Sequence, residues 1–61
     1  MPTNEERAAT AEATLRSLTP PHEDERDAFV DFLTNVMHAR SVTWFDDAVR
    51  VAKQHHEEEV I

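Results

Sequence analysis

Carboxylates at regular spacing are the side chains in this chain with the clearest chemical potential. In residues 22–33, HEDERDAFVDFL, acids stand four residues apart at Glu23, Asp27 and Asp31. That spacing returns a helix to the same side, and each like-charge pair costs about 0.2–0.5 kcal/mol. The helix dipole favours acids only in the first turn. One interpretation is that these acids form a solvated face. The other is that they contact Lys or Arg on a partner protein, and a local energetic cost without a structural gain favours it.

The same helix has an apolar side, and the acids lie opposite to it. On a helical wheel the aspartates of this stretch point away from Phe29 and Val36. Further along, Trp44 and Phe45 are adjacent, so their side chains diverge by about 100° and cannot both face inward. Trp44 therefore either covers a turn or anchors an interface. The predicted partner-binding residues are Asp24, Asp27, Asp31 and Trp44.

A second cluster, near the C-terminus, contains residue types that bind metal ions. His55 and Glu59 are four residues apart, and His56 and Glu59 are three apart, so a helix aims them in one direction. His38 is too far along a neighbouring helix to converge with them. The alternative is histidine at the edge of the core with Glu59 as a hydrogen-bond partner. We expect no metal and no cofactor. If a metal ion does bind, which is the less favoured hypothesis, its candidate ligands are His55, His56 and Glu59.

Composition excludes several classes of function. The chain has no cysteine, which removes thiol catalysis, disulfides and cysteine–zinc sites. It has no glycine, which argues against tight hairpins, P-loops and dinucleotide-binding motifs. No paired-acid cleft or supported Ser/His/Asp set is visible, and 61 residues leave little room for a pocket. We expect no catalytic residue and no enzyme activity.

Charge restricts the partners. The formal net charge of −7 argues against direct contact with nucleic acid or anionic membranes, both of which need basic surfaces. It fits a protein partner with a basic surface. The sequence also lacks a signal core or an apolar run long enough to span a membrane. A cytoplasmic location is therefore expected.

The elements that must position these residues are helices. Three segments, residues 4–18, 20–39 and 43–58, show helical periodicity and capping signals. Thr3 with Glu6 forms a capping box for the first, Thr19 followed by Pro20 starts the second, and Ser41 or Thr43 caps the third. We predict an all-α, compact three-helix domain over residues 1–61. Helices 2 and 3 form an antiparallel hairpin, and residues 1–3 and 59–61 fray.

The predicted core is small for an independent domain. Chains of about 60 residues bury only ~60% of their unfolded surface and usually need a staple or a partner. A homodimer or an obligate partner is therefore plausible. Apart from alanines, the predicted core comprises Leu15, Leu18, Phe29, Phe32, Leu33, Val36, Met37, Val42, Trp44, Phe45, Val49 and Val51.

Residues 29–59 carry a pattern of acids and histidines. An apolar segment contains Asp31 and ends in His38, and a second helix opens with Phe45–Asp46 and ends in histidine and glutamate. The stretch resembles small uncharacterised acidic helical proteins of phages, plasmids and bacteria, although Asn35 stands where the pattern has another acid. The resemblance implies that the hairpin is a reused unit. It also implies a mobile-element setting, in which small acidic proteins often inhibit larger machines.

These observations lead to one leading hypothesis and two alternatives. The leading one is a non-enzymatic, acidic protein-binding module that inhibits or regulates a larger complex by contacting its basic surface. An anti-defence protein, such as a CRISPR inhibitor that blocks a nucleic-acid-binding groove, is a concrete version. The first alternative is a self-associating structural or accessory subunit. The lesser alternative is a helical protein that binds a metal through histidine and glutamate.

Overall fold

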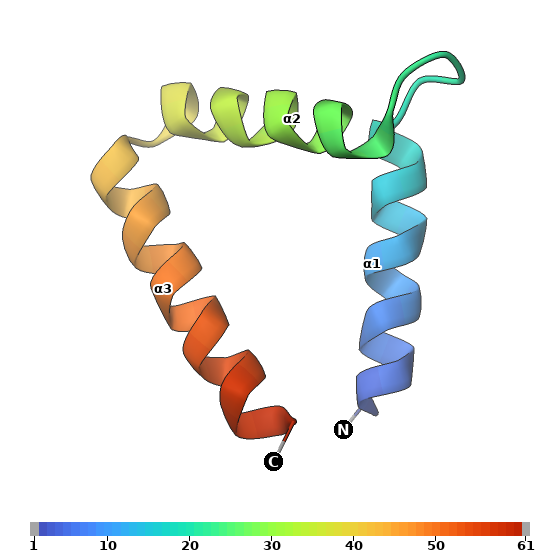
Figure 1. Ribbon diagram of the computed structural model, residues 1–61. Coiled ribbons are helices and arrows are strands. Elements are labelled where there is room, and N and C mark those ends of the chain that lie inside the picture. Colours follow the sequence, from blue (N-terminus) through green and yellow to red (C-terminus); the bar gives the residue numbers. More distant parts are fainter. Residues whose placement is uncertain (1, 61) are drawn as a thin grey trace.

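The computed structural model describes residues 2–60 as three α-helices, and no strand occurs in that range (Figure 1). Helix α1 spans Asn4–Leu18, α2 spans Glu25–Ala39 and α3 spans Val42–Glu59. The predicted all-α, three-helix fold is confirmed. Met1 and Ile61, two of the residues predicted to fray, lie outside the described range.

Helix α1 is capped by a threonine at each end. The Thr3 hydroxyl accepts a hydrogen bond from the Glu6 backbone N–H at 3.1 Å, as the predicted capping box requires. At the other end, the Thr19 hydroxyl donates to the Leu15 carbonyl at 2.7 Å, and the Thr19 N–H donates to the Arg16 carbonyl. Pro20 follows, and a residue before proline avoids helical geometry, so the helix stops there.

Helix α2 starts later than the sequence predicted. Thr19 was expected to cap it, but its hydroxyl closes α1 instead, and a turn follows in which the Glu23 N–H donates to the Pro20 carbonyl at 3.1 Å. The cap is Asp24, whose carboxylate accepts a hydrogen bond from the Asp27 N–H at 3.2 Å. The predicted N-cap was therefore wrong, and the first helical residue is Glu25.

Helix α3 follows after a two-residue corner. The Ser41 hydroxyl accepts from the Trp44 N–H at 3.0 Å, which selects Ser41 over Thr43 as the cap. The bounds Val42–Glu59 extend the prediction by one residue at each end.

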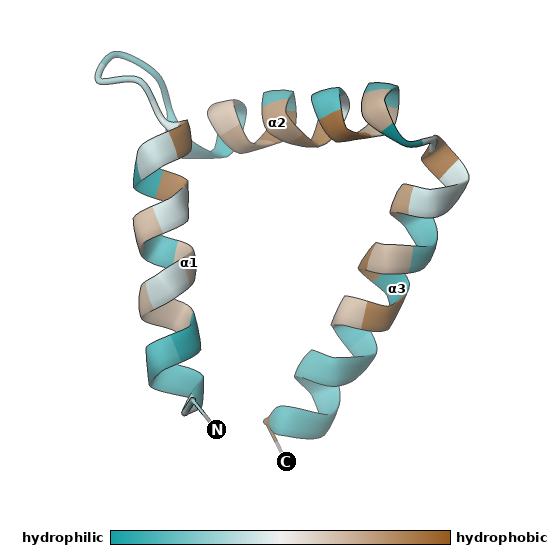
Figure 2. Ribbon diagram, turned by 180° about the vertical axis from the view of Figure 1, so that it is seen from behind, coloured by the Kyte–Doolittle hydropathy of each residue, from teal (hydrophilic) through white to brown (hydrophobic). Residues whose placement is uncertain are grey.

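The three helices enclose an open frame rather than a stack. Figures 1 and 2 view the chain from front and back, and in neither does one helix cover another along its length. Helix α2 contacts α1 at one corner and α3 at the other, so its contacts with α3 are consistent with the predicted pairing. The two helices diverge from the corner at Arg40 and Ser41 (Figure 1), so they form adjacent sides of the frame.

Because all three helices lie in one layer, apolar side chains find few neighbours. Ala28, at the α1–α2 corner, is the single buried residue of the described range, with 5% of its surface exposed. Of the predicted core, Phe29, Phe32, Val42 and Trp44 are exposed. The other predicted core residues are half-buried: Leu15, Leu18, Leu33, Val36, Met37, Phe45, Val49 and Val51.

Candidate protein-binding faces of helix α2

The later start of α2 changes how its acids are explained. Glu23 lies outside the helix, so only one of the two expected like-charge pairs, Asp27–Asp31, remains on it. Asp24 is the cap, and Asp27 lies in the first turn, where the helix dipole stabilises a carboxylate. Two of the three predicted contact aspartates thus have a role in the helix itself.

Asp31 has no such structural role. It is exposed, it lies in the second turn, and within residues 2–60 it accepts no hydrogen bond or ion pair from another side chain. Its side chain stands at the rim of a small hollow at the α1–α2 corner, beside Ala28. None of the acids between residues 22 and 31 forms an ion pair in the described chain, so this surface keeps its negative charge. We call Asp24, Asp27 and Asp31 the acidic face of α2.

Trp44 does not belong to this surface. It lies in the first turn of α3, while Asp24 caps the opposite end of α2. The 15 residues of α2 separate them by about 22 Å along the helix axis. Trp44 is 51% exposed, so it is free for a contact, but the four predicted partner-binding residues do not form one site.

An apolar groove runs along the inner corner between α1 and α2. Figure 2 shows apolar residues along α2 and at the ends of α1 and α3 nearest to it, while the far ends of α1 and α3 are hydrophilic. The groove measures about 510 Å³. Its lining includes Leu15 and Leu18 from α1 and Glu25, Arg26, Phe29 and Phe32 from α2; we call these residues the α1–α2 groove.

The groove and the acidic face are largely on different sides of α2, and they adjoin at Phe32, which also lines the hollow beside Asp31. Phe29 and Asp31 are two residues apart, which places them about 160° apart on the helical wheel. Both are exposed, Phe29 by 39% of its surface. Helix α2 therefore presents an apolar side and an acidic side to its surroundings at the same time.

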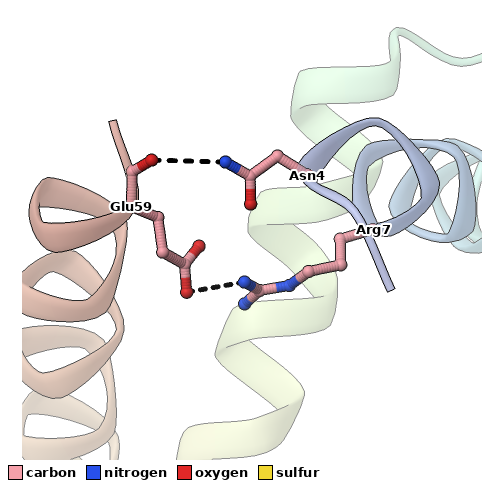
Figure 3. Close-up of polar contacts among 3 residues, drawn as sticks. All are labelled: Asn4, Arg7 and Glu59. Atoms are coloured by element: carbon pink, nitrogen blue, oxygen red, sulfur yellow. Dashed lines mark hydrogen bonds and ion pairs between the residues drawn. The ribbon is translucent and has the colours of Figure 1, made fainter. Parts of the chain in front are cut away.

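The free ends of α1 and α3 are joined by polar contacts (Figure 3). Arg7 Nη1 lies 2.6 Å from Glu59 Oε1, and the Asn4 side-chain amide donates to the Glu59 carbonyl at 3.3 Å. The hydrogen bond from Arg7 lowers the pKa of the Glu59 carboxyl; partial desolvation opposes this, and the charges of Arg7, His55 and His56 add to it. The same pairing raises the pKa of Arg7.

We call these contacts of Arg7 and Asn4 with Glu59 the α1–α3 closure. They give Glu59 a different partner from the one that the metal hypothesis needs. His55, His56 and Glu59 line one hollow with Arg7, yet Glu59 binds the guanidinium. Within residues 2–60, no three side chains of His, Cys, Asp or Glu converge as a bound metal ion requires. The weaker metal hypothesis gains no support from this geometry.

Sequence reasoning missed both the groove and the closure. The groove depends on how far α1 and α2 open from their corner, and no spacing within one helix reports that. Glu59 was singled out, but as a partner for histidine; Arg7 lies at the other end of the chain, 52 positions away. A signal did exist in α1, because Arg7 falls beside the small apolar stripe that includes Ala11 and Leu18.

Comparisons with protein-family models, with curated proteins and with solved structures return no match for this chain. The resemblance of residues 29–59 to small acidic proteins of mobile elements stays a prediction. Among residues 2–60, the structure holds no helix that combines the length and apolarity required for crossing a membrane.

Proposed function

We propose that the chain is a non-enzymatic protein-binding module whose acidic face on α2 contacts a basic surface of a larger protein. The observation that carries the proposal is Asp31, an exposed carboxylate without a cap role or an ion pair in the described chain. Its neighbour Asp27 adds a second charge four residues away, at a local cost that a cation on a partner would reverse.

The overall charge supports the same class of partner. A net charge of −7 on 61 residues raises the rate of encounter with basic surfaces and repels other acidic ones. A small inhibitor or regulator of a nucleic-acid-handling complex would use such carboxylates where phosphates otherwise bind. An anti-defence protein of a phage or mobile element, such as a CRISPR inhibitor, is one concrete version of this proposal.

Charge reversal tests the proposal. The double variant Asp27→Lys/Asp31→Lys should bind a lysine- and arginine-rich helical peptide about tenfold more weakly, roughly 1.4 kcal/mol, in titration calorimetry at low salt. The difference should shrink at high salt, because exposed charges are screened. Far-UV circular dichroism would confirm that the helices persist.

The matched control is Asp46→Lys/Asp47→Lys, which makes the same change in net charge on α3. It should weaken binding much less, because these acids lie on another helix and Asp47 is already paired with Arg50 at 2.6 Å. Equal losses in the two double variants would show that only total charge matters, and the proposal for the acidic face would fail.

A further inference from the structure

The chain exposes more surface than a folded protein of its mass normally does. Its accessible surface is 5393 Å², while a monomer of 7.0 kDa is expected to expose about 4,000 Å². Its radius of gyration is 13.4 Å, against about 10.5 Å for a globular domain of 61 residues. The surplus, about 1,400 Å², exceeds the ~800 Å² that one partner contributes to a standard interface.

Part of this additional accessible surface lies at the α1–α2 groove, where it is apolar. Phe29 and Phe32 are 39% and 41% exposed, and Leu15 beside them is only half-buried. Domains are normally built from two packed layers around a core, and this chain supplies one layer. A second layer over the groove would bury these side chains, which no helix of the chain itself covers.

The groove is the part of the surface where two copies of this acidic chain can meet with the least repulsion. Its lining contains one acid, Glu25, and one base, Arg26, so it carries no net charge although the whole chain carries −7. A basic protein gains nothing electrostatically at a neutral groove. Two copies can meet there through the neutral lining, and salt screens the remaining repulsion between their net charges of −7.

We propose that the α1–α2 groove is the seat of a second copy of this chain, paired about a two-fold axis. In such an isologous interface the same patch is used twice, and we place Glu25 of each copy against Arg26 of the other. Phe29 and Phe32 of both copies then form the shared core between two helical layers. The inference goes beyond the proposed binding of a basic protein and does not depend on it, because the groove residues are not those of the acidic face.

Sedimentation equilibrium of the full chain tests the pairing. The expected result is a species of twice the chain mass that dissociates on dilution, together with a melting temperature that rises with protein concentration. Phe29→Asp should weaken the dimer at least tenfold, while Asp46→Asn, at an exposed position of α3, should leave it unchanged. A chain that stays monomeric at all concentrations overturns the proposal and leaves the groove to a different protein.

Exchange of the two groove charges gives a test that leaves the apolar residues intact. Glu25→Lys and Arg26→Glu should each weaken the dimer several-fold, because each places like charges together across the two-fold axis. The double exchange Glu25→Lys/Arg26→Glu should restore it. Circular dichroism of each variant separates loss of pairing from loss of folding. If the double exchange is weaker than both single variants, the assigned two-fold contact is wrong.

Discussion

The two sides of α2 differ in what they expose and in why they expose it. The apolar side carries Phe29 and Phe32, which are exposed because no second layer of helices covers them. The acidic side carries Asp27 and Asp31, which are exposed as well. An exposed apolar side chain on α2 indicates that a covering layer is missing. An exposed carboxylate indicates a partner contact only where it has no structural role within the chain.

Neither side contributes much to the stability of the isolated chain. The apolar side chains keep about two fifths of their surface in water, and the acids of residues 22–31 form no ion pair within the described chain. Between the two sides lies Ala28, the one buried residue among residues 2–60. Variants at Phe29, Phe32 and Asp31 should therefore report on association, and variants at Ala28 and at the cap Asp24 should report on folding.

The largest effect on folding is expected at Ala28. Ala28→Asn buries an amide without a hydrogen-bond partner at the α1–α2 corner and should lower the free energy of unfolding by about 1–3 kcal/mol. Urea denaturation at one low protein concentration measures this. The control is Ala48→Asn, at an exposed position of α3, where only the helix propensity changes, by about 0.5 kcal/mol. Equal losses at the two alanines would mean that the corner is not packed.

A smaller effect separates the acids that stabilise α2 from the one that does not. Asp24→Ala removes the cap and should cost about 1 kcal/mol of stability in the same denaturation experiment. Asp31→Asn should be neutral or slightly stabilising, because it relieves the like-charge pair with Asp27 at about 0.2–0.5 kcal/mol. A stability loss at Asp31 as large as that at Asp24 would contradict the assignment of Asp31 to partner contact.

The smallest effect is expected far from both sides, where Arg7 meets Glu59. The folded-state pKa of Glu59 is depressed, so its pairing stabilises the chain above the ordinary glutamate pKa of about 4.3 and is lost as pH falls through the lower folded value. Carbon-detected NMR titration should show the Glu59 carboxyl titrating at lower pH in the native chain than in Arg7→Gln. Identical curves would show that the closure does not form in solution.

Local signals predicted the helices well because each end depends on side chains close in sequence. The Thr3 cap uses Glu6, and α3 ends within one residue of its predicted bound. The predicted start of α2 was wrong because two residues, Thr19 and Asp24, could each cap a helix. The Thr19 hydroxyl donates its hydrogen bond to the Leu15 carbonyl instead. Nothing in the TPP sequence indicates this choice.

The arrangement of the helices was less predictable. Helical periodicity marks Phe29 and Phe32 as one side of α2, and it cannot show whether another helix of the same chain covers that side. The prediction named the core residues apart from alanines, so it did not single out Ala28, the residue that is buried. The split of the predicted contact set has the same origin, since Trp44 and Asp24 are separated by the length of α2.

In the proposed dimer the apolar side of α2 pairs with a second copy of the chain and the acidic side does not. Because the chain has no cysteine, Phe29→Cys and Asp27→Cys each place a single thiol on one side of the helix. Mild oxidation at a concentration where the native chain is dimeric should convert Phe29→Cys efficiently into a disulfide-linked dimer and leave Asp27→Cys mainly monomeric. Equal crosslinking of the two variants, or more crosslinking through Asp27→Cys, would contradict this pairing.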